Sequence, residues 1–160
     1  MQKHTVYIES TIPSYLTAKV PRDPIHLLRQ NETKLWWKTI LPKLHPVISS
    51  FVLKEINDGD ISAAKRRLEA VEGFEVLQSN ATIEALADRL INELHIPKNA
   101  KTDALHLATA VVYEIDFVLS WNFDHIVGAP IRKTFSEIGL ELGLKMPTLT
   151  TPTDFLGGKI

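Results

Sequence analysis

Short apolar runs alternate along this chain with longer stretches of helical spacing. The runs predict strands at residues 4–9, 47–50, 74–77 and 117–120, with a last short strand at 148–150. Between them, apolar residues recur every three or four positions, which predicts helices at about residues 24–41, 61–71, 83–94, 103–110 and 131–142. Strands that alternate with helices predict an α/β fold with a parallel sheet covered on both faces and joined by right-handed crossovers.

Length and composition favour one globular domain that spans residues 1–160. Hydrophobic residues make up 44% of the chain and charged residues 23%, which is ordinary for a folded domain of this size. No apolar run approaches the roughly 20 residues that cross a bilayer, and residues 1–9 lack the apolar core of a signal peptide. We therefore expect no membrane partner.

The absence of cysteine and the near-neutral charge narrow the chemistry. Without cysteine, disulfides, thiolate nucleophiles and cysteine-based metal sites are excluded, and the chain is compatible with a reducing cytoplasm, where we expect it. A net charge of -1 leaves no global basic footprint for nucleic acid, so such binding would depend on local patches and a metal ion. Glycine-rich phosphate loops and a Gly-x-Ser-x-Gly elbow are also missing.

Acidic and amide side chains follow the predicted strands. Glu9 ends the first strand, Glu55 follows the second, and Asn122 and Asp124 follow the fourth, while Asp103 opens an apolar helix. Ligands of a parallel sheet bind outside the carboxyl ends of its strands, and carboxylates that meet there can bind a hard divalent cation. These positions therefore predict a metal-dependent enzyme.

Each acid also has an ordinary structural explanation when it is taken alone. Glu9 can be a solvated strand end beside a helix cap, Glu55 a surface charge, and Asp103 a complement to the helix dipole. Asn122 and Asp124 suit a turn. The metal interpretation depends on whether the acids converge in space.

Other polar and aromatic residues have two interpretations. His106 is more typical of a buried structural histidine than of a ligand, since no His-Glu-x-x-His spacing is present. The basic runs at 65–67 and 132–133 are typical of solvated helix faces, although they could contact phosphate. Trp36, Trp37 and Trp121 suit the core or an interface.

Four segments taken together resemble the PIN-domain family, and most closely its prokaryotic VapC-type ribonuclease toxins. They are Val-Tyr-Ile-Glu-Ser-Thr (6–11), Ser-Ser-Phe-Val-Leu-Lys-Glu (49–55), Thr-Asp-Ala-Leu-His-Leu-Ala-Thr-Ala (102–110) and Asp-Phe-Val-Leu-Ser-Trp-Asn-Phe-Asp-His-Ile (116–126). Each motif is weak alone, but their order and spacing are fairly specific. The resemblance implies a three-layer α/β/α sandwich with a parallel sheet of four or five strands in the order 3-2-1-4-5.

The resemblance also implies a function and a set of site residues. It implies Mg²⁺- or Mn²⁺-dependent hydrolysis of RNA, a homodimer, and an antitoxin protein as partner. Glu9, Glu55 and Asp103 stand at the three acidic positions and would hold the metal. Thr11 matches the hydroxyl residue after the first acid, and Asn122 matches a fourth position that is often acidic.

Two departures from the family pattern leave a second interpretation open. The first acid is usually Asp, and the extra methylene of Glu9 would push its carboxylate outward. Asn122 is neutral, which lowers the site charge by one, although Asp124 could compensate. A PIN fold that binds RNA or a protein without cutting is therefore the alternative, and a regulatory partner that works through its surface is a third.

Overall fold

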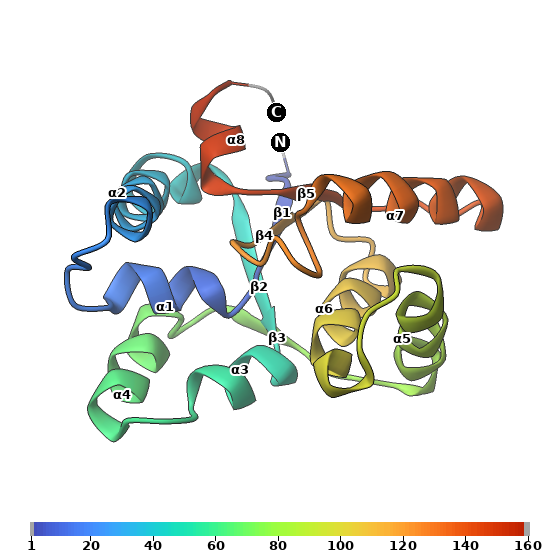
Figure 1. Cartoon of the computed structure of the whole chain (residues 1–160), viewed down its shortest axis with the longest axis horizontal. Coiled ribbons are helices and arrows are strands. Elements are labelled where there is room, and N and C mark those ends of the chain that lie inside the picture. The colour runs from blue at the N-terminus through green and yellow to red at the C-terminus, as the bar shows by residue number, and fades with distance from the viewer. Residues whose placement is uncertain (1, 159–160) are drawn as a thin grey trace.

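A parallel five-stranded sheet forms the centre of the molecule (Figure 1). The computed structural model describes residues 2–158. The strands are β1 (Thr5–Ile8), β2 (His45–Ser49), β3 (Glu75–Leu77), β4 (Phe117–Leu119) and β5 (Thr148–Thr150). Their order is β3-β2-β1-β4-β5, which confirms the predicted order 3-2-1-4-5. In the register, Tyr7 of β1 lies beside Val47 of β2 and Val118 of β4.

Helices cover both faces of this sheet, as the three-layer expectation requires. In Figure 1, α1, α2 and α4 lie on one side, and α5, α6 and α7 lie on the other. The α-helices are α1 (Thr11–Thr17), α2 (Pro24–Thr39), α3 (Ser50–Ile56), α4 (Ile61–Ala70), α5 (Ala81–Glu93), α6 (Lys101–Val112), α7 (Ala129–Leu142) and α8 (Pro152–Leu156). Two single turns of 3-10 helix, η1 (Leu41–Lys43) and η2 (Lys98–Ala100), precede β2 and α6.

Besides the short helix α3, which directly follows β2, two helices were not predicted from the sequence. The segment after Glu9 contains Pro13, which predicts a break, but the chain forms α1 there. Pro13 is the third residue of this helix, where the backbone N–H has no partner within the helix in any case, so the ring removes no hydrogen bond. The second is α8, which a reciprocal capping box of Thr151 and Asp154 begins.

The core is continuous across the sheet. The side chains of Val6, Tyr7 and Ile8 are all 0% exposed, because helices pack against both faces of β1. In α6, every residue from Ala104 to Val111 is buried, which confirms the expectation of a helix that is apolar nearly all round. Full burial of each aliphatic side chain stabilises the fold by roughly 1.5–3 kcal/mol relative to exposure.

No helix within residues 2–158 combines the length and the apolar character that crossing a membrane requires.

Candidate metal centre at the carboxyl edge of the sheet

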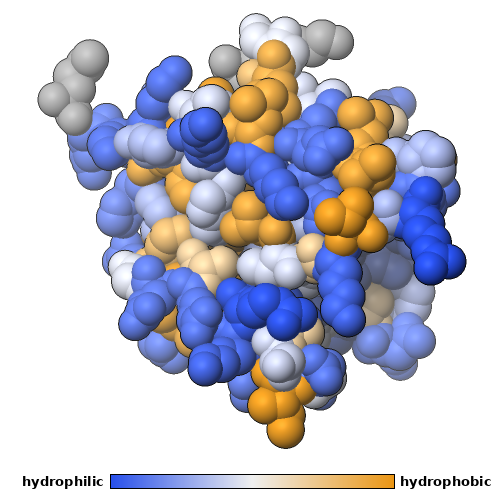
Figure 2. All heavy atoms as spheres, turned by 90° about the vertical axis from the view of Figure 1, so that its left-hand side faces the viewer, coloured by the Kyte–Doolittle hydropathy of each residue, from blue (hydrophilic) through white to orange (hydrophobic). Residues whose placement is uncertain are grey.

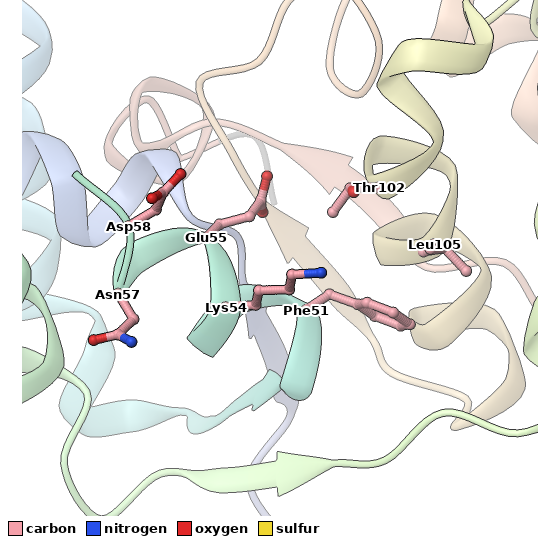
Figure 3. A pocket seen from close by; sticks show the side chains of 7 residues that line it. All are labelled: Phe51, Lys54, Glu55, Asn57, Asp58, Thr102 and Leu105. Carbon is pink, nitrogen blue, oxygen red and sulfur yellow. The ribbon is translucent and has the colours of Figure 1, made fainter.

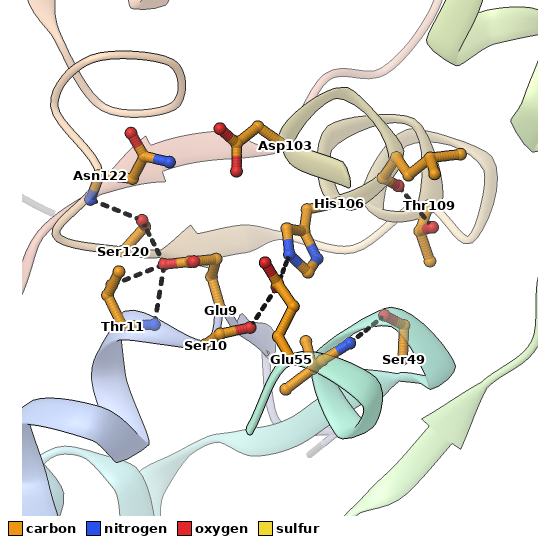
Figure 4. Close-up of polar contacts among 12 residues, drawn as sticks. Glu9, Ser10, Thr11, Ser49, Glu55, Asp103, His106, Thr109, Ser120 and Asn122 are labelled. Carbon is orange, nitrogen blue, oxygen red and sulfur yellow. Dashed lines mark hydrogen bonds and ion pairs between the residues drawn. The ribbon is translucent and has the colours of Figure 1, made fainter. Parts of the chain in front are cut away.

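The topology brings all four of the sequence motifs to one edge of the sheet. Strand β1 lies between β2 and β4, so the carboxyl ends of these three strands adjoin. Glu9 follows β1 directly, Ser120 follows β4, and β2 continues into α3, which carries Glu55. Helix α6 brings Asp103 and His106 to the same edge (Figure 4).

Glu9 is held rigidly in spite of its longer side chain. Its Oε1 accepts hydrogen bonds from Thr11 Oγ1 at 2.6 Å, Ser120 Oγ at 2.6 Å and the Thr11 backbone N–H at 3.2 Å. Its backbone N–H donates to the Leu119 carbonyl across the sheet. Hydrogen bonds therefore fix both the backbone and the carboxylate of Glu9, and the residue is 2% exposed.

The second carboxylate oxygen of Glu9 is left for a ligand. No hydrogen bond within residues 2–158 reaches Oε2, and the one fully buried side-chain polar atom without a partner in this part of the chain is Trp36 Nε1. Oε2 is therefore accessible. Burial raises the pKa of the Glu9 carboxyl, although the charge of His106 and the hydrogen bonds from Ser120 and Thr11 oppose that shift. A cation near Oε2 would favour the ionised form.

Glu55 and His106 form a close pair beside Glu9. The Oε1 atom of Glu55 lies 2.5 Å from His106 Nε2 and accepts a hydrogen bond from Ser10 Oγ, also at 2.5 Å. Burial raises the pKa of Glu55, but the hydrogen bond and the charge of His106 outweigh it, so the pKa lies below its usual range. Burial lowers the pKa of His106, but the bond to Glu55 and the charge of Glu9 outweigh it and raise the pKa. Both shifts favour an imidazolium paired with a carboxylate.

A buried chain of hydroxyls orients His106 from behind. Its Nδ1 lies 2.5 Å from the Tyr7 hydroxyl, which lies 2.7 Å from Ser49 Oγ. Tyr7, Ser49 and His106 are each 0% exposed, and burial raises the pKa of Tyr7, so its hydroxyl stays protonated. The ring of His106 is thus held with Nε2 directed at Glu55.

Glu9, Glu55 and His106 together offer a cation site. Each contributes one ligand atom, and the three atoms lie within 4.8 Å of one another. Carboxylate oxygens suit Mg²⁺ and Mn²⁺, and an imidazole nitrogen is more typical of transition metals than of Mg²⁺. The donor set fits a divalent cation, with Mn²⁺ the better match if the imidazole takes part.

The remaining expected residues lie around this cluster. Asp103 Oδ2 lies 2.8 Å from His125 Nδ1, and Figure 4 shows its carboxylate facing the side chain of Asn122. Asn122 Oδ1 accepts a hydrogen bond from the His125 backbone N–H, so both residues hold the loop after β4. Asp124 is exposed, and within the described residues no hydrogen bond or ion pair joins it to the cluster.

A pocket of about 450 Å³ opens beside Glu55 (Figure 3). Its lining residues combine an apolar floor with polar groups: Phe51, Lys54, Glu55, Asn57, Asp58, Thr102 and Leu105. Glu55 belongs to both the pocket and the acid cluster. A substrate bound in this pocket would therefore contact the candidate centre, and Lys54 would place a positive charge near it.

Each of the two basic runs combines one arginine that holds a loop with neighbours that are exposed. Arg67 donates to the carbonyls of Ile56 and Asp58, and Arg132 donates to the Val127 carbonyl and to Asp154. Both arginines therefore hold loops in place. Their neighbours Lys65, Arg66 and Lys133 are exposed, as expected for solvated helix faces.

Sequence reasoning missed several members of the site. His106 was expected to be a buried structural histidine; it is buried, but it also lies against Glu55 within the cluster. Ser120 and Tyr7 were read as strand residues, yet one holds Glu9 and the other holds His106. The spacing of His106 three residues after Asp103 on a helix is the one signal that could have indicated its position.

Several solved structures of toxin proteins share this fold. A toxin–antitoxin complex from Klebsiella pneumoniae aligns with a TM-score of 0.60 and 17% identity, covering 92% of this chain and 97% of that chain. The VapC20 toxin of Mycobacterium tuberculosis, which cleaves the sarcin–ricin loop, aligns with a TM-score of 0.58 and 17% identity. The alignment covers 75% of this chain and 92% of that chain. VapBC-1 from nontypeable Haemophilus influenzae aligns with a TM-score of 0.56 and 16% identity, and the alignment covers 93% of this chain and 98% of that chain.

These similarities confirm the expected PIN-like three-layer fold. At such identities the likeness concerns the fold, and activity must be argued from the site. No protein-family model matches the sequence, and no curated protein matches it.

Proposed function

We propose that this protein is a divalent-metal-dependent ribonuclease that hydrolyses RNA phosphodiester bonds, and that it is the toxin of a type II toxin–antitoxin pair. The observation that carries the proposal is the convergence of Glu9, at the end of β1, and Glu55, from α3, on one cluster within 4.8 Å. Toxin proteins that share the fold, one of them an RNA-cleaving toxin, support the choice of substrate class.

Glu9 and Glu55 would hold Mg²⁺ or Mn²⁺. Asp103, which α6 brings to the same edge of the sheet, would assist directly or through water. When bound, such an ion polarises a phosphate oxygen and lowers the pKa of a water molecule. Thr11 and Ser120 keep Glu9 in place by occupying its Oε1, which leaves Oε2 to the ion. Asn122 and His125 keep the loop after β4 against Asp103.

His106 determines the charge of the site before any ion binds. An imidazolium at this position would neutralise part of the charge of Glu9 and Glu55, which would let the buried carboxylate of Glu9 lie close to the partly exposed carboxylate of Glu55. A divalent cation would compete with that proton, because both are stabilised by the same carboxylates. We therefore expect cation binding to release a proton.

The test uses the double variant Glu9→Ala, Asp103→Ala. We expect Mn²⁺ binding in calorimetry to vanish. RNA cleavage should fall by more than roughly 100-fold, because losing even a residue that only supports a metal ligand costs up to about that much activity. Asp124→Ala is the matched control, since this exposed acid lies outside the cluster. Cleavage by the double variant at the wild-type rate would refute the assignment, and a thermal melt of each variant checks that it folds.

A non-catalytic RNA- or protein-binding module is the second candidate, and one observation favours it. His106 Nε2 lies 2.5 Å from Glu55 Oε1 and the pKa of His106 is raised, so an imidazolium could offset the charge of the acids in place of a metal. On this alternative, wild type binds RNA in the presence of EDTA and does not cleave it when Mn²⁺ is added. Cleavage that appears with Mn²⁺ and disappears with EDTA excludes it.

We also propose a homodimer and an antitoxin protein as partners. Trp36 is 0% exposed and Trp37 packs against Phe74, so the tryptophans of α2 belong mainly to the core. The outer face of α2 instead exposes Ile25, Leu28 and Leu35. Figure 2 shows this side of the molecule, where apolar patches are separated by polar side chains. Sedimentation velocity over a range of concentrations tests the dimer.

A further inference from the structure

The loop after β4 carries an aromatic side chain that the core does not use. Phe123 directly follows Asn122 and is 44% exposed. Trp121, two residues earlier, is 5% exposed, and its indole N–H donates to Thr33 Oγ1 at 2.8 Å. One ring of this loop is therefore anchored in the core, and the other remains at the surface.

Arg29 of α2 lies against both rings and keeps most of its hydrogen-bonding capacity. The centre of its guanidinium lies 5.1 Å from the Phe123 ring centroid and 5.6 Å from that of Trp121. Its side chain donates to the Tyr15 hydroxyl at 3.3 Å, and within residues 2–158 no carboxylate forms an ion pair with it. A guanidinium has five N–H donors, so four remain for a ligand.

The patch formed by Arg29, Trp121 and Phe123 lies next to the acid cluster, because the loop that carries both rings is hydrogen-bonded to residues that hold Glu9. The Trp121 backbone N–H donates to Thr11 Oγ1 at 2.9 Å, and that hydroxyl donates to Glu9. Ser120 also donates a hydrogen bond to Glu9. Phe123 is three residues after Ser120, so the Cα atoms of Ser120 and Phe123 are at most about 11 Å apart. A ligand on the patch would lie within a short distance of the cluster.

We propose that this aromatic–arginine patch is a stacking subsite for a nucleobase of single-stranded RNA, next to the phosphodiester at the acid cluster. Unpaired bases stack on exposed aromatic rings and on arginine planes, and guanidinium N–H groups bind the flanking phosphate. An exposed ring beside an arginine without a counter-ion matches both halves of a nucleotide. The location next to the cleaved bond rests on the proposed ribonuclease function, whereas base stacking itself does not.

The experiment measures RNA binding without catalysis. Fluorescence anisotropy in EDTA gives the Kd of labelled oligoadenylate, oligouridylate and an abasic ribose-phosphate oligomer. We expect Phe123→Ala and Arg29→Ala to weaken oligoadenylate binding roughly 5- to 150-fold, the range of about 1–3 kcal/mol for one stacked base. The abasic oligomer should bind Phe123→Ala and wild type equally well.

Matched variants separate stacking from charge and from apolar bulk. Phe123→Leu keeps an apolar side chain but removes the ring, and Arg29→Lys keeps the charge but removes the planar group. Both should weaken oligoadenylate binding. Lys34→Ala removes an exposed charge from the same helix outside the patch and should change the Kd little. A thermal melt of each variant confirms that the fold is retained.

The results also distinguish this subsite from the proposed function. Unchanged oligoadenylate affinity in both Phe123→Ala and Arg29→Ala would overturn the subsite, even if wild type cleaves RNA with Mn²⁺, and would leave a protein contact as the use of the patch. Weakened affinity in both variants supports the subsite even if no cleavage occurs. Wild type that fails to bind any oligomer would overturn it as well.

Discussion

At the scale of single residues, Asp116 shows how one carboxylate can join two strands. It accepts hydrogen bonds from the Thr5 backbone N–H at 2.9 Å and from Thr5 Oγ1 at 3.2 Å, and Lys145 Nζ lies 2.9 Å away. Partial burial raises its pKa, but the bonds from Thr5 and the charge of Lys145 outweigh that and lower the pKa from 3.8 to about 2. The ionised form is therefore favoured by folding.

A pH dependence of stability follows from this carboxylate. Because the folded pKa lies below the unfolded value, the contribution is complete above pH 3.8 and is lost as the pH falls toward about 2. We expect it to amount to about 2 kcal/mol, since one pKa unit corresponds to about 1.36 kcal/mol. Urea unfolding of wild type and Asp116→Asn across this range measures it. If both proteins lose the same stability on acidification, Asp116 does not contribute.

Glu9 shows why the residue identity alone left its role undecided. The additional methylene relative to Asp was expected to push the carboxylate outward, yet three hydrogen bonds hold Oε1 at a nearly buried position. Two of those donors belong to Thr11, close in sequence, and the third belongs to Ser120, 111 residues away. Only the pairing of β1 with β4 supplies that third donor.

At the scale of secondary structure, Ser49 links the start of α3 to the site. Its hydroxyl accepts a hydrogen bond from the Val52 backbone N–H as the helix N-cap, and it bonds to the Tyr7 hydroxyl that holds His106. Loss of a cap costs about 1 kcal/mol, and a buried hydroxyl that loses a partner costs about as much again. Ser49 therefore stabilises the helix that carries Glu55 and the ring that faces it.

We expect Ser49→Ala to lower the free energy of unfolding by about 1–3 kcal/mol. Asn80→Ala is the matched control, because Asn80 caps α5 with an equivalent bond to Ile83 but is exposed and contacts no site residue. It should cost only about 1 kcal/mol. Equal losses in the two variants, measured by chemical denaturation, would show that the Tyr7 contact adds nothing.

At the scale of the whole molecule, one core joins both helical layers through β1. Ile8 is 0% exposed on this central strand, whereas Leu140 of α7 is 84% exposed. Removing buried side-chain atoms leaves a cavity, so we expect Ile8→Ala to cost about 2–5 kcal/mol. Leu140→Ala should change stability by less than about 0.5 kcal/mol.

Urea unfolding that is followed by tryptophan fluorescence and by far-ultraviolet circular dichroism measures both variants. A shared core predicts coincident transitions and an unchanged dependence on urea concentration. Two separate transitions in wild type would contradict a single cooperative core. A loss in Ile8→Ala no larger than that in Leu140→Ala would contradict the central role of β1.

The sequence by itself determined the alternation of strands and helices, and with it the parallel sheet. Periodicity is a local property, so the helices α2, α4, α5 and α7 were predicted to within a few residues. It was less informative where local and tertiary effects compete. Pro13 predicted a break, but at the third position of α1 its missing N–H costs nothing. The ends of short strands also shifted, because pairing with neighbours decides where a strand begins.

The tertiary structure alone decided which polar residues form the site. Motif order indicated Glu9, Glu55, Asp103 and Asn122, but convergence depends on β1 lying between β2 and β4. The same packing placed His106 against Glu55, left Asp124 at the surface, and set Arg29 over Phe123. Hydrogen bonds and charge pairs act over a few ångströms, and residues far apart in the chain reach that distance only when the strands pair and the helices pack.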